Sequence, residues 1–110
     1  MHAVIAWWDL TESGQSAESL RQVLRDEALP HFAQMPGLRV KFWISDPQTQ
    51  RWGAVFLWES AEAAAAATPS RIGALIGYPP VFSSAFEVEA VTEGLFGDPA
   101  LAGRGLAFGG

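Results

Sequence analysis

The sequence predicts an α+β domain of the ferredoxin-like type, with one antiparallel sheet and the order strand, helix, strand, strand, helix, strand. Two observations favour this class. Apolar runs, some continuous and some alternating, occupy residues 2–10, 38–45, 51–59 and 82–91, and such runs are typical of strands. Segments with apolar residues at helical spacing follow the first and the third run. This order places both helices on one face of the sheet and leaves the other face without a cover.

The composition is that of one folded domain. A chain of 110 residues with 49% hydrophobic and 17% charged residues can bury one core. The net charge of -5 argues against nucleic acid and anionic membranes as partners, because phosphate binding needs clustered cations. No run is long enough to span a membrane and no signal-type segment begins the chain, so we expect a cytoplasmic protein. With no cysteine and only His2 and His31 as imidazoles, we expect neither a disulfide nor a protein-built metal site.

The first half of the chain is expected to form a strand, a helix and the first strand of a hairpin. Residues 2–10 form strand one, and Ser16 is a candidate N-cap for a helix that begins at residue 17. We expect Pro30 to kink or end this helix, with one more turn before Pro36 and Gly37. Strand two follows at residues 38–45, and the turn at Asp46 and Pro47 leads into strand three at residues 51–59.

The second half is expected to add two short helices, a strand and a tail. Ser60 is a plausible N-cap for the alanine run 61–67, and Thr68 with Pro69 is a second candidate cap, for a helix that ends at Gly77. Strand four covers residues 82–91, with Phe82 and Phe86 on one face. We therefore divide the chain into a domain at residues 1–91 and a glycine-rich tail at residues 92–110. The tail is either disordered or lies over an apolar surface of a neighbour; its apolar residues are Leu95, Phe96, Leu101, Leu106 and Phe108.

Aromatic residues are expected on the uncovered sheet face. Trp7 and Trp8 are neighbours in one strand, so one of them must point away from the helices. In strand two, if the set Leu38, Val40, Phe42 and Ile44 packs on the helices, Trp43 shares the open face with Lys41. Large aromatic side chains on that face need a partner sheet or a ligand to bury them. We therefore expect a homodimer in which the open faces of two sheets meet.

Several segments of the chain resemble the YdhR-type monooxygenases of the dimeric α+β barrel superfamily, which includes the antibiotic-biosynthesis monooxygenases. The residues that carry the likeness are Pro36, Gly37 and Leu38 with Lys41, Phe42 and Trp43, then residues 53–58 running into 59–63, then Ser70, Arg71, Ile72, Leu75 and Gly77, and finally Phe86, Glu87 and Val88. The likeness spans roughly residues 2–91. It implies a dimeric barrel fold and a cofactor-independent monooxygenase.

The candidate binding residues follow from this resemblance and from the strand pattern. Trp58 lies where relatives place a pocket tryptophan. Together with Trp43 and Trp7 it would stack on a flat aromatic substrate. The alternative for each of these tryptophans is packing within the sheet. Arg71 matches an arginine of the family and would bind an anionic group at the pocket mouth, or else be a solvated helix residue. Relatives that bind haem use a histidine in the second helical region, and residues 60–80 contain none.

The candidate catalytic residues are His31, Lys41 and Glu87. Lys41 would stabilise an enolate or phenolate, or alternatively form a salt bridge to Glu87 across the dimer. His31 is the natural base near pH 7, or a surface group stabilised by a helix dipole. Asp9, Glu87 and Glu89 are carboxylates that would serve as a base if partly desolvated.

Three functions remain open from the sequence. The first is a cofactor-independent monooxygenase acting on an aromatic or enolisable, polyketide-like small molecule, in which the substrate itself reduces dioxygen. The second is a non-oxidative cyclase or isomerase that uses the same base and oxyanion holder. The third is a non-catalytic ligand-binding dimer, which would be favoured if His31, Asp9, Glu87 and Lys41 all lay far from any cavity.

Overall fold

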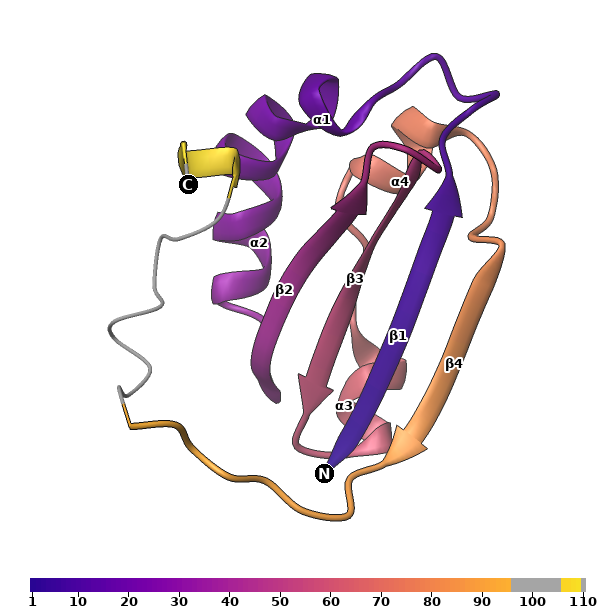
Figure 1. Ribbon diagram of the computed structural model, residues 1–110. Helices are drawn as coiled ribbons and strands as arrows, with labels where there is room; N and C mark the ends of the chain where they lie inside the picture. The colour runs from indigo at the N-terminus through magenta and orange to yellow at the C-terminus, as the bar shows by residue number, and fades with distance from the viewer. Residues whose placement is uncertain (96–105, 110) are drawn as a thin grey trace.

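One four-stranded antiparallel sheet forms the frame of the protein, with the helices on one of its faces (Figure 1). The computed structural model describes residues 1–95 and 106–109. The strands are β1 (His2–Asp9), β2 (Leu38–Asp46), β3 (Arg51–Trp58) and β4 (Phe82–Glu87). Their order in space is β2-β3-β1-β4, so β2 and β4 are the edges. This confirms the ferredoxin-like α+β class; within one chain the sheet is open and does not close into a barrel.

The first helical segment is continuous from Ala17 to Ala33 but changes its winding. It comprises α1 (Ala17–Val23), the π-helical turn η1 (Leu24–Ala28) and α2 (Leu29–Ala33). Ser16 caps α1 as expected: its side chain accepts from the Ser19 backbone N–H, and the Ser19 hydroxyl accepts from the N–H of Ser16. The expectation for Pro30 was wrong in one respect, because the helix continues past it. The wide turn η1 immediately before Pro30 relaxes the backbone where a proline lacks its N–H.

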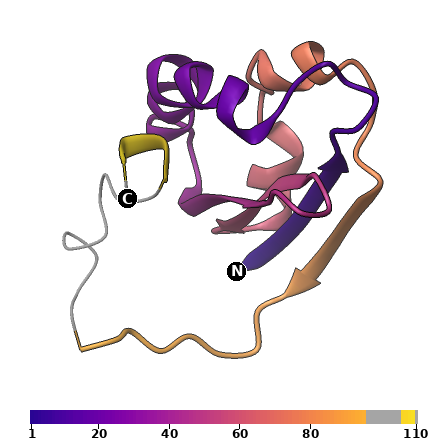
Figure 2. The same ribbon diagram turned by 45° about the horizontal axis from the view of Figure 1, so that its top comes forward.

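The second helical segment is shorter and consists of two separate helices, α3 (Ala61–Ala66) and α4 (Ile72–Ile76). Ser60 caps α3 by accepting from the Ala63 N–H at 3.1 Å, as the sequence predicts. Thr68 caps no helix, since α4 begins four residues later at Ile72. Gly77 ends α4 in the left-handed conformation with φ of 91°. Figure 2 shows both helical segments on the same side of the sheet.

The core lies between the sheet and these helices. Leu20 of α1 is completely buried, and Trp52 of β3 and Ile72 of α4 are 5% and 3% exposed. Trp8 of β1 packs against this cluster, and its indole N–H donates to the backbone oxygen of Tyr78 at 2.8 Å. Trp8 is therefore the tryptophan of strand one that faces the helices, and Trp7 is the one that faces away.

The face assignment of β2 was wrong, and the two sets of alternating residues are exchanged. Lys41 and Trp43 point toward the helices, where both contact the ring of Phe32 on α2. Val40, Phe42 and Ile44 lie on the open face and are 46%, 51% and 40% exposed. A register shift between Leu38 and Val40 means that these two residues do not share a face of the sheet, although they are two positions apart. Alternation along the sequence does not reveal such a shift.

The C-terminal part that the structure describes lies against the same chain. The 3₁₀ turn η3 (Leu106–Phe108) is beside α1 and η1, and Arg25 donates to the Ala107 backbone oxygen at 3.0 Å. Of the apolar tail residues, Phe96 and Leu101 lie outside the described residues. The last strand is shorter than expected and ends at Glu87. None of the helices in the described segments has the length and apolar character needed to cross a bilayer.

Candidate functional site

A cavity of about 330 Å³ lies between the helix-facing side of the sheet and the helices. Side chains of β1, β2 and β3 form its floor, and Phe32 of α2 with the segment from α3 to α4 forms its roof and rim. The lining residues are Val4, Ala6, Trp8, Phe32, Lys41, Trp43, Trp52, Ala54, Phe56, Trp58, Ala64, Ala67, Thr68, Pro69, Ser70, Ile72 and Gly73. A cavity of this size is at the lower end of the range for small-molecule sites.

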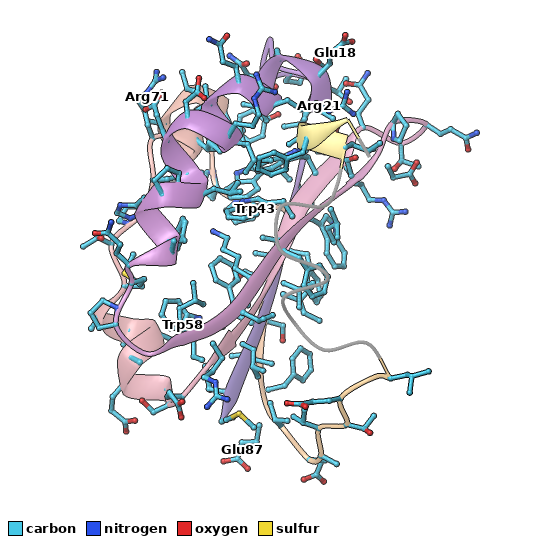
Figure 3. The ribbon with its side chains drawn as sticks, turned by 90° about the vertical axis from the view of Figure 1, so that its left-hand side faces the viewer. Glu18, Arg21, Trp43, Trp58, Arg71 and Glu87 are labelled. Carbon is cyan, nitrogen blue, oxygen red and sulfur yellow. The ribbon has the colours of Figure 1, made fainter. Side chains whose placement is uncertain are left out.

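Aromatic rings make up most of the cavity wall. Trp58 is 2% exposed and stacks on Phe56, with ring centroids 6.0 Å apart and planes 12° apart. Trp43 meets Phe32 edge to face at 6.0 Å. In Figure 3, Trp43 and Trp58 both lie between the sheet and the helices. Two of the three predicted substrate-stacking tryptophans therefore line one cavity.

Lys41 is the one ionisable side chain of this lining, as far as the described residues go. Its Nζ lies 3.3 Å from the ring centroid of Phe32, 4.1 Å from that of Phe56 and 4.5 Å from that of Trp43. Burial lowers the pKa of Lys41 from 10.5 to about 7, because the ammonium loses water. The three ring faces attract the ammonium and oppose part of this change. The alternative for Lys41, a salt bridge to Glu87 across a dimer, stays a prediction; among the described residues Lys41 forms no ion pair.

His31 lies at the rim of the cavity and not in its wall. Its Nε2 is 2.9 Å from the backbone oxygen of Thr68 and 3.3 Å from the Thr68 hydroxyl, and Thr68 itself lines the cavity. The His31 ring also meets the edge of Phe32 at 4.9 Å. His31 and Lys41 thus contact the same phenylalanine. The imidazole of His31 is a second side chain at this rim that carries exchangeable protons.

The other predicted site residues lie outside this cavity. Arg71 forms a two-point ion pair with Glu27 on the outer surface, at 2.9 and 2.6 Å, and this pairing lowers the pKa of Glu27. Glu87 is at the exposed end of β4, at the foot of the molecule in Figure 3. The Asp9 carboxylate is held by Thr11, whose hydrogen bonds lower the pKa of Asp9. Glu89 follows β4 and is exposed.

Trp7 lies on the opposite face of the sheet from the cavity. Its ring stacks on Phe82 at 4.1 Å with planes 11° apart. A smaller hollow of about 200 Å³ adjoins it, lined also by Ile44, Asp46 and Arg51. The geometry therefore separates Trp7 from Trp43 and Trp58, which the sequence had placed together.

Two important wall residues did not emerge from the sequence. Phe32 and Phe56 enclose the Lys41 amine, yet they read as ordinary apolar positions of a helix and a strand. The signal for Phe56 was present in the hairpin, because Lys41 pairs with Phe56 in register and the two must share a face. No comparable signal exists for Phe32, whose approach depends on how α2 packs on the sheet.

Comparison with known proteins agrees with the fold and with the earlier resemblance. The family model described as "Putative mono-oxygenase ydhR" matches residues 5–93, which include β2, β3, β4, β1 from Ile5 onward, and the whole cavity lining except Val4. A search of curated proteins found no match. Since the family model covers well over half of the chain, the chain belongs to the ydhR mono-oxygenase family.

Proposed function

We propose that the protein is a cofactor-independent mono-oxygenase whose substrate is an aromatic or enolisable small molecule bound in the cavity of Lys41. The observation that carries this proposal is the position of the Lys41 amine, at the wall of an apolar cavity and among three aromatic rings. Flat rings of a substrate would stack against Trp43 and Trp58. A cavity of about 330 Å³ suits one small fused-ring molecule.

Lys41 supports this chemistry because a pKa of about 7 leaves much of the amine neutral at neutral pH. The neutral amine accepts a proton from an acidic C–H or phenolic O–H of the substrate. The resulting ammonium then lies beside the enolate or phenolate and stabilises it in a site of low dielectric. The non-catalytic alternative would have been favoured if all four candidate groups lay far from a cavity, and Lys41 lines one.

The oxygen chemistry balances without an added reductant. A methylene carbon that is activated by a neighbouring ring or carbonyl loses two hydrogens and gains one oxygen atom, and the second oxygen atom leaves as water. The substrate carbon supplies all four electrons that dioxygen accepts. The protein then has only to form the carbanion, hold it and keep bulk water out.

An oxygen electrode with a panel of fused-ring phenols and cyclic diketones tests the proposal. We expect oxygen consumption with at least one member of the panel, a mass gain of one oxygen and a loss of two hydrogens in the product, and loss of activity in Lys41→Met. Arg71→Met is the matched control, because Arg71 lies on the outer surface, and it should retain activity. Turnover that continues under nitrogen would contradict the oxygenase and favour the cyclase or isomerase.

We also propose that a second copy of the chain covers the open sheet face. This face carries exposed apolar side chains from both edge strands, with Phe42 at 51% and Phe86 at 49% exposed. Between them lie Ile5, Trp7, Val55 and Leu57 of the central strands. The charged pair Asp46 and Arg51 lies at one end of the strands on this face, and the wide apolar surface beside it suits another sheet of the same kind.

Light scattering tests the assembly directly. We expect a mass of twice the 11.8 kDa chain for the wild type, and a shift to the mass of one chain for Phe42→Asp, which places a charge in the middle of the edge strand β2 on this face. Ala65→Asp is the control, since Ala65 is exposed on α3 on the helical side. A wild-type protein with the mass of one chain at micromolar concentration would contradict this proposal.

A further inference from the structure

We propose that the Lys41 amine captures carbonyl compounds covalently, and that the cavity accepts aromatic aldehydes and ketones which condense with Nζ to form an imine. This goes beyond the proposed oxygenase, because the condensation needs no oxygen and stands whether or not the protein consumes any. The inference rests on the apolar surroundings of the amine and on its access to the cavity. The fact that Lys41 is the single lysine of the chain makes the reaction easy to test.

The surroundings of Nζ are apolar and offer it no permanent partner. Across residues 1–95 and 106–109 no ion pair or hydrogen bond engages Nζ, and its neighbours are the rings of Phe32, Phe56 and Trp43. An ammonium that is removed from water and has no carboxylate beside it loses its proton readily. This is why the pKa of Lys41 is lowered to about 7. A neutral amine is the form that attacks a carbonyl carbon.

The amine also remains accessible from the cavity. In the described part of the chain, no fully buried side-chain nitrogen or oxygen lacks a hydrogen-bond partner. Nζ has no such partner, which agrees with a Lys41 side chain that is only partly buried. Lys41 lines the cavity, so the cavity is the open space next to the amine. A flat carbonyl compound lying along Trp43 and Trp58 would bring its C=O group to this amine.

The condensation is balanced in atoms and electrons. Nζ forms a bond to the carbonyl carbon while a proton moves from nitrogen to oxygen, which gives a carbinolamine. The C–O bond then breaks, the oxygen leaves with a second proton as water, and a C=N bond remains. No oxidant or reductant takes part. The hydroxyl groups of Thr68 and Ser70 line the same cavity, and Thr68 contacts His31 at the rim, so groups able to pass these protons are near.

The composition of the chain makes this reaction easy to detect. Lys41 is the single lysine among the 110 residues, and there is no cysteine to compete for an aldehyde. The remaining amine is the α-amino group of Met1, which lies in a different tryptic peptide from Lys41. A mass gain on the peptide around residue 41 therefore reports on one nitrogen atom.

Reductive trapping under nitrogen tests the proposal. The full chain is incubated at pH 7 with 2-naphthaldehyde and sodium cyanoborohydride, which reduces the imine to a stable secondary amine, and the adduct is located by peptide mass spectrometry. We expect Lys41 in the folded protein to react roughly tenfold faster or more than Lys41 in the same chain unfolded in urea. The reason is that about half of the folded amine is neutral at pH 7, against about one in a few thousand for an ordinary lysine.

Each outcome decides the matter. Equal or slower labelling of Lys41 in the folded chain, relative to the unfolded chain, overturns the proposal, and this comparison needs no variant to fold. Lys41→Met should retain only the adduct on the α-amine of Met1. Glyoxylate, a small charged aldehyde, should label folded Lys41 much more slowly than 2-naphthaldehyde; equal rates would contradict the aromatic class of ligand. Labelling that succeeds while the phenol panel consumes no oxygen would support the amine chemistry and refute only the oxygenase.

Discussion

Replacing Lys41 by methionine should stabilise the protein near neutral pH and should lose this effect in alkali. The pKa of Lys41 is about 7 in the folded protein and 10.5 for an ordinary lysine. The unfolded chain therefore binds more protons than the folded chain between pH 7 and pH 10.5, and the free energy of unfolding rises with pH through this window. Below pH 7 the destabilisation by the buried lysine is fully present, and above pH 10.5 it is absent.

The magnitude follows from the two pKa values and from the rings around the amine. The pKa difference alone corresponds to a destabilisation of about 4 kcal/mol at pH 7. Attraction of the ammonium to the faces of Phe32, Phe56 and Trp43 opposes the desolvation. Desolvation is the larger effect, because the pKa of Lys41 still falls to about 7, so we expect Lys41→Met to gain about 4 kcal/mol at pH 7.

Urea unfolding of both proteins at several pH values between 6 and 11 measures this difference, because the ionisable groups other than Lys41 are common to both proteins and their contributions cancel. A single-lysine chain also allows a direct measurement: with ¹³Cε-labelled lysine, one NMR resonance reports the pKa of Lys41. A stability difference that changes by less than about 1 kcal/mol over this pH range, or an NMR pKa near 10.5, would refute the reasoning and remove the base from the proposed mechanism.

Three further substitutions test other parts of the structure by thermal or urea unfolding. Ser16→Ala should cost about 1 kcal/mol through loss of the capping box of α1, and an unchanged midpoint would mean that α1 does not need this cap. Gly37→Ala should cost about 2 kcal/mol or more, since φ is 81° and an added Cβ would lie 2.5 Å from the Ala63 Cβ; a neutral result would contradict the left-handed turn. Gly73→Ala should instead stabilise α4 by about 0.5 kcal/mol, because an added Cβ meets nothing within 4 Å, and a lower midpoint would place an atom there that the structure does not show.

Features set by neighbouring residues could be predicted from the sequence. Ser16 and Ser60 cap their helices, Gly77 ends α4, and the turn after Asp46 joins two antiparallel strands. Each of these depends on side chains and backbone within a few residues, so the local pattern is sufficient. The order of these elements along the chain then predicted their pairing into one antiparallel sheet.

The side of the sheet that the helices cover could not be predicted from alternation. Alternation shows that Lys41 and Trp43 share a face and that Phe42 and Ile44 share the other, but it does not say which face is covered. We expected the more apolar set in the core, and the structure places Val40, Phe42 and Ile44 of this set on the open side. The aliphatic stem of Lys41 and the ring of Trp43 supply enough apolar surface to pack beneath α2. For the same reason the sequence predicted a pocket on the open face, whereas the structure has the cavity on the covered face.

Two neighbouring residues of β2 lie on opposite faces of the sheet. Lys41 points into the cavity and Phe42 points to the open face, so the proposed assembly and the proposed chemistry would act on opposite sides of one strand. The rings that enclose the Lys41 amine all come from the same chain, which means that the desolvation of the amine needs no partner. A dimer through the open face would therefore hold the sheet that carries the cavity floor without contributing to the environment of Nζ. On this view, Phe42→Asp should change the mass in solution while the pKa and the reactivity of Lys41 persist.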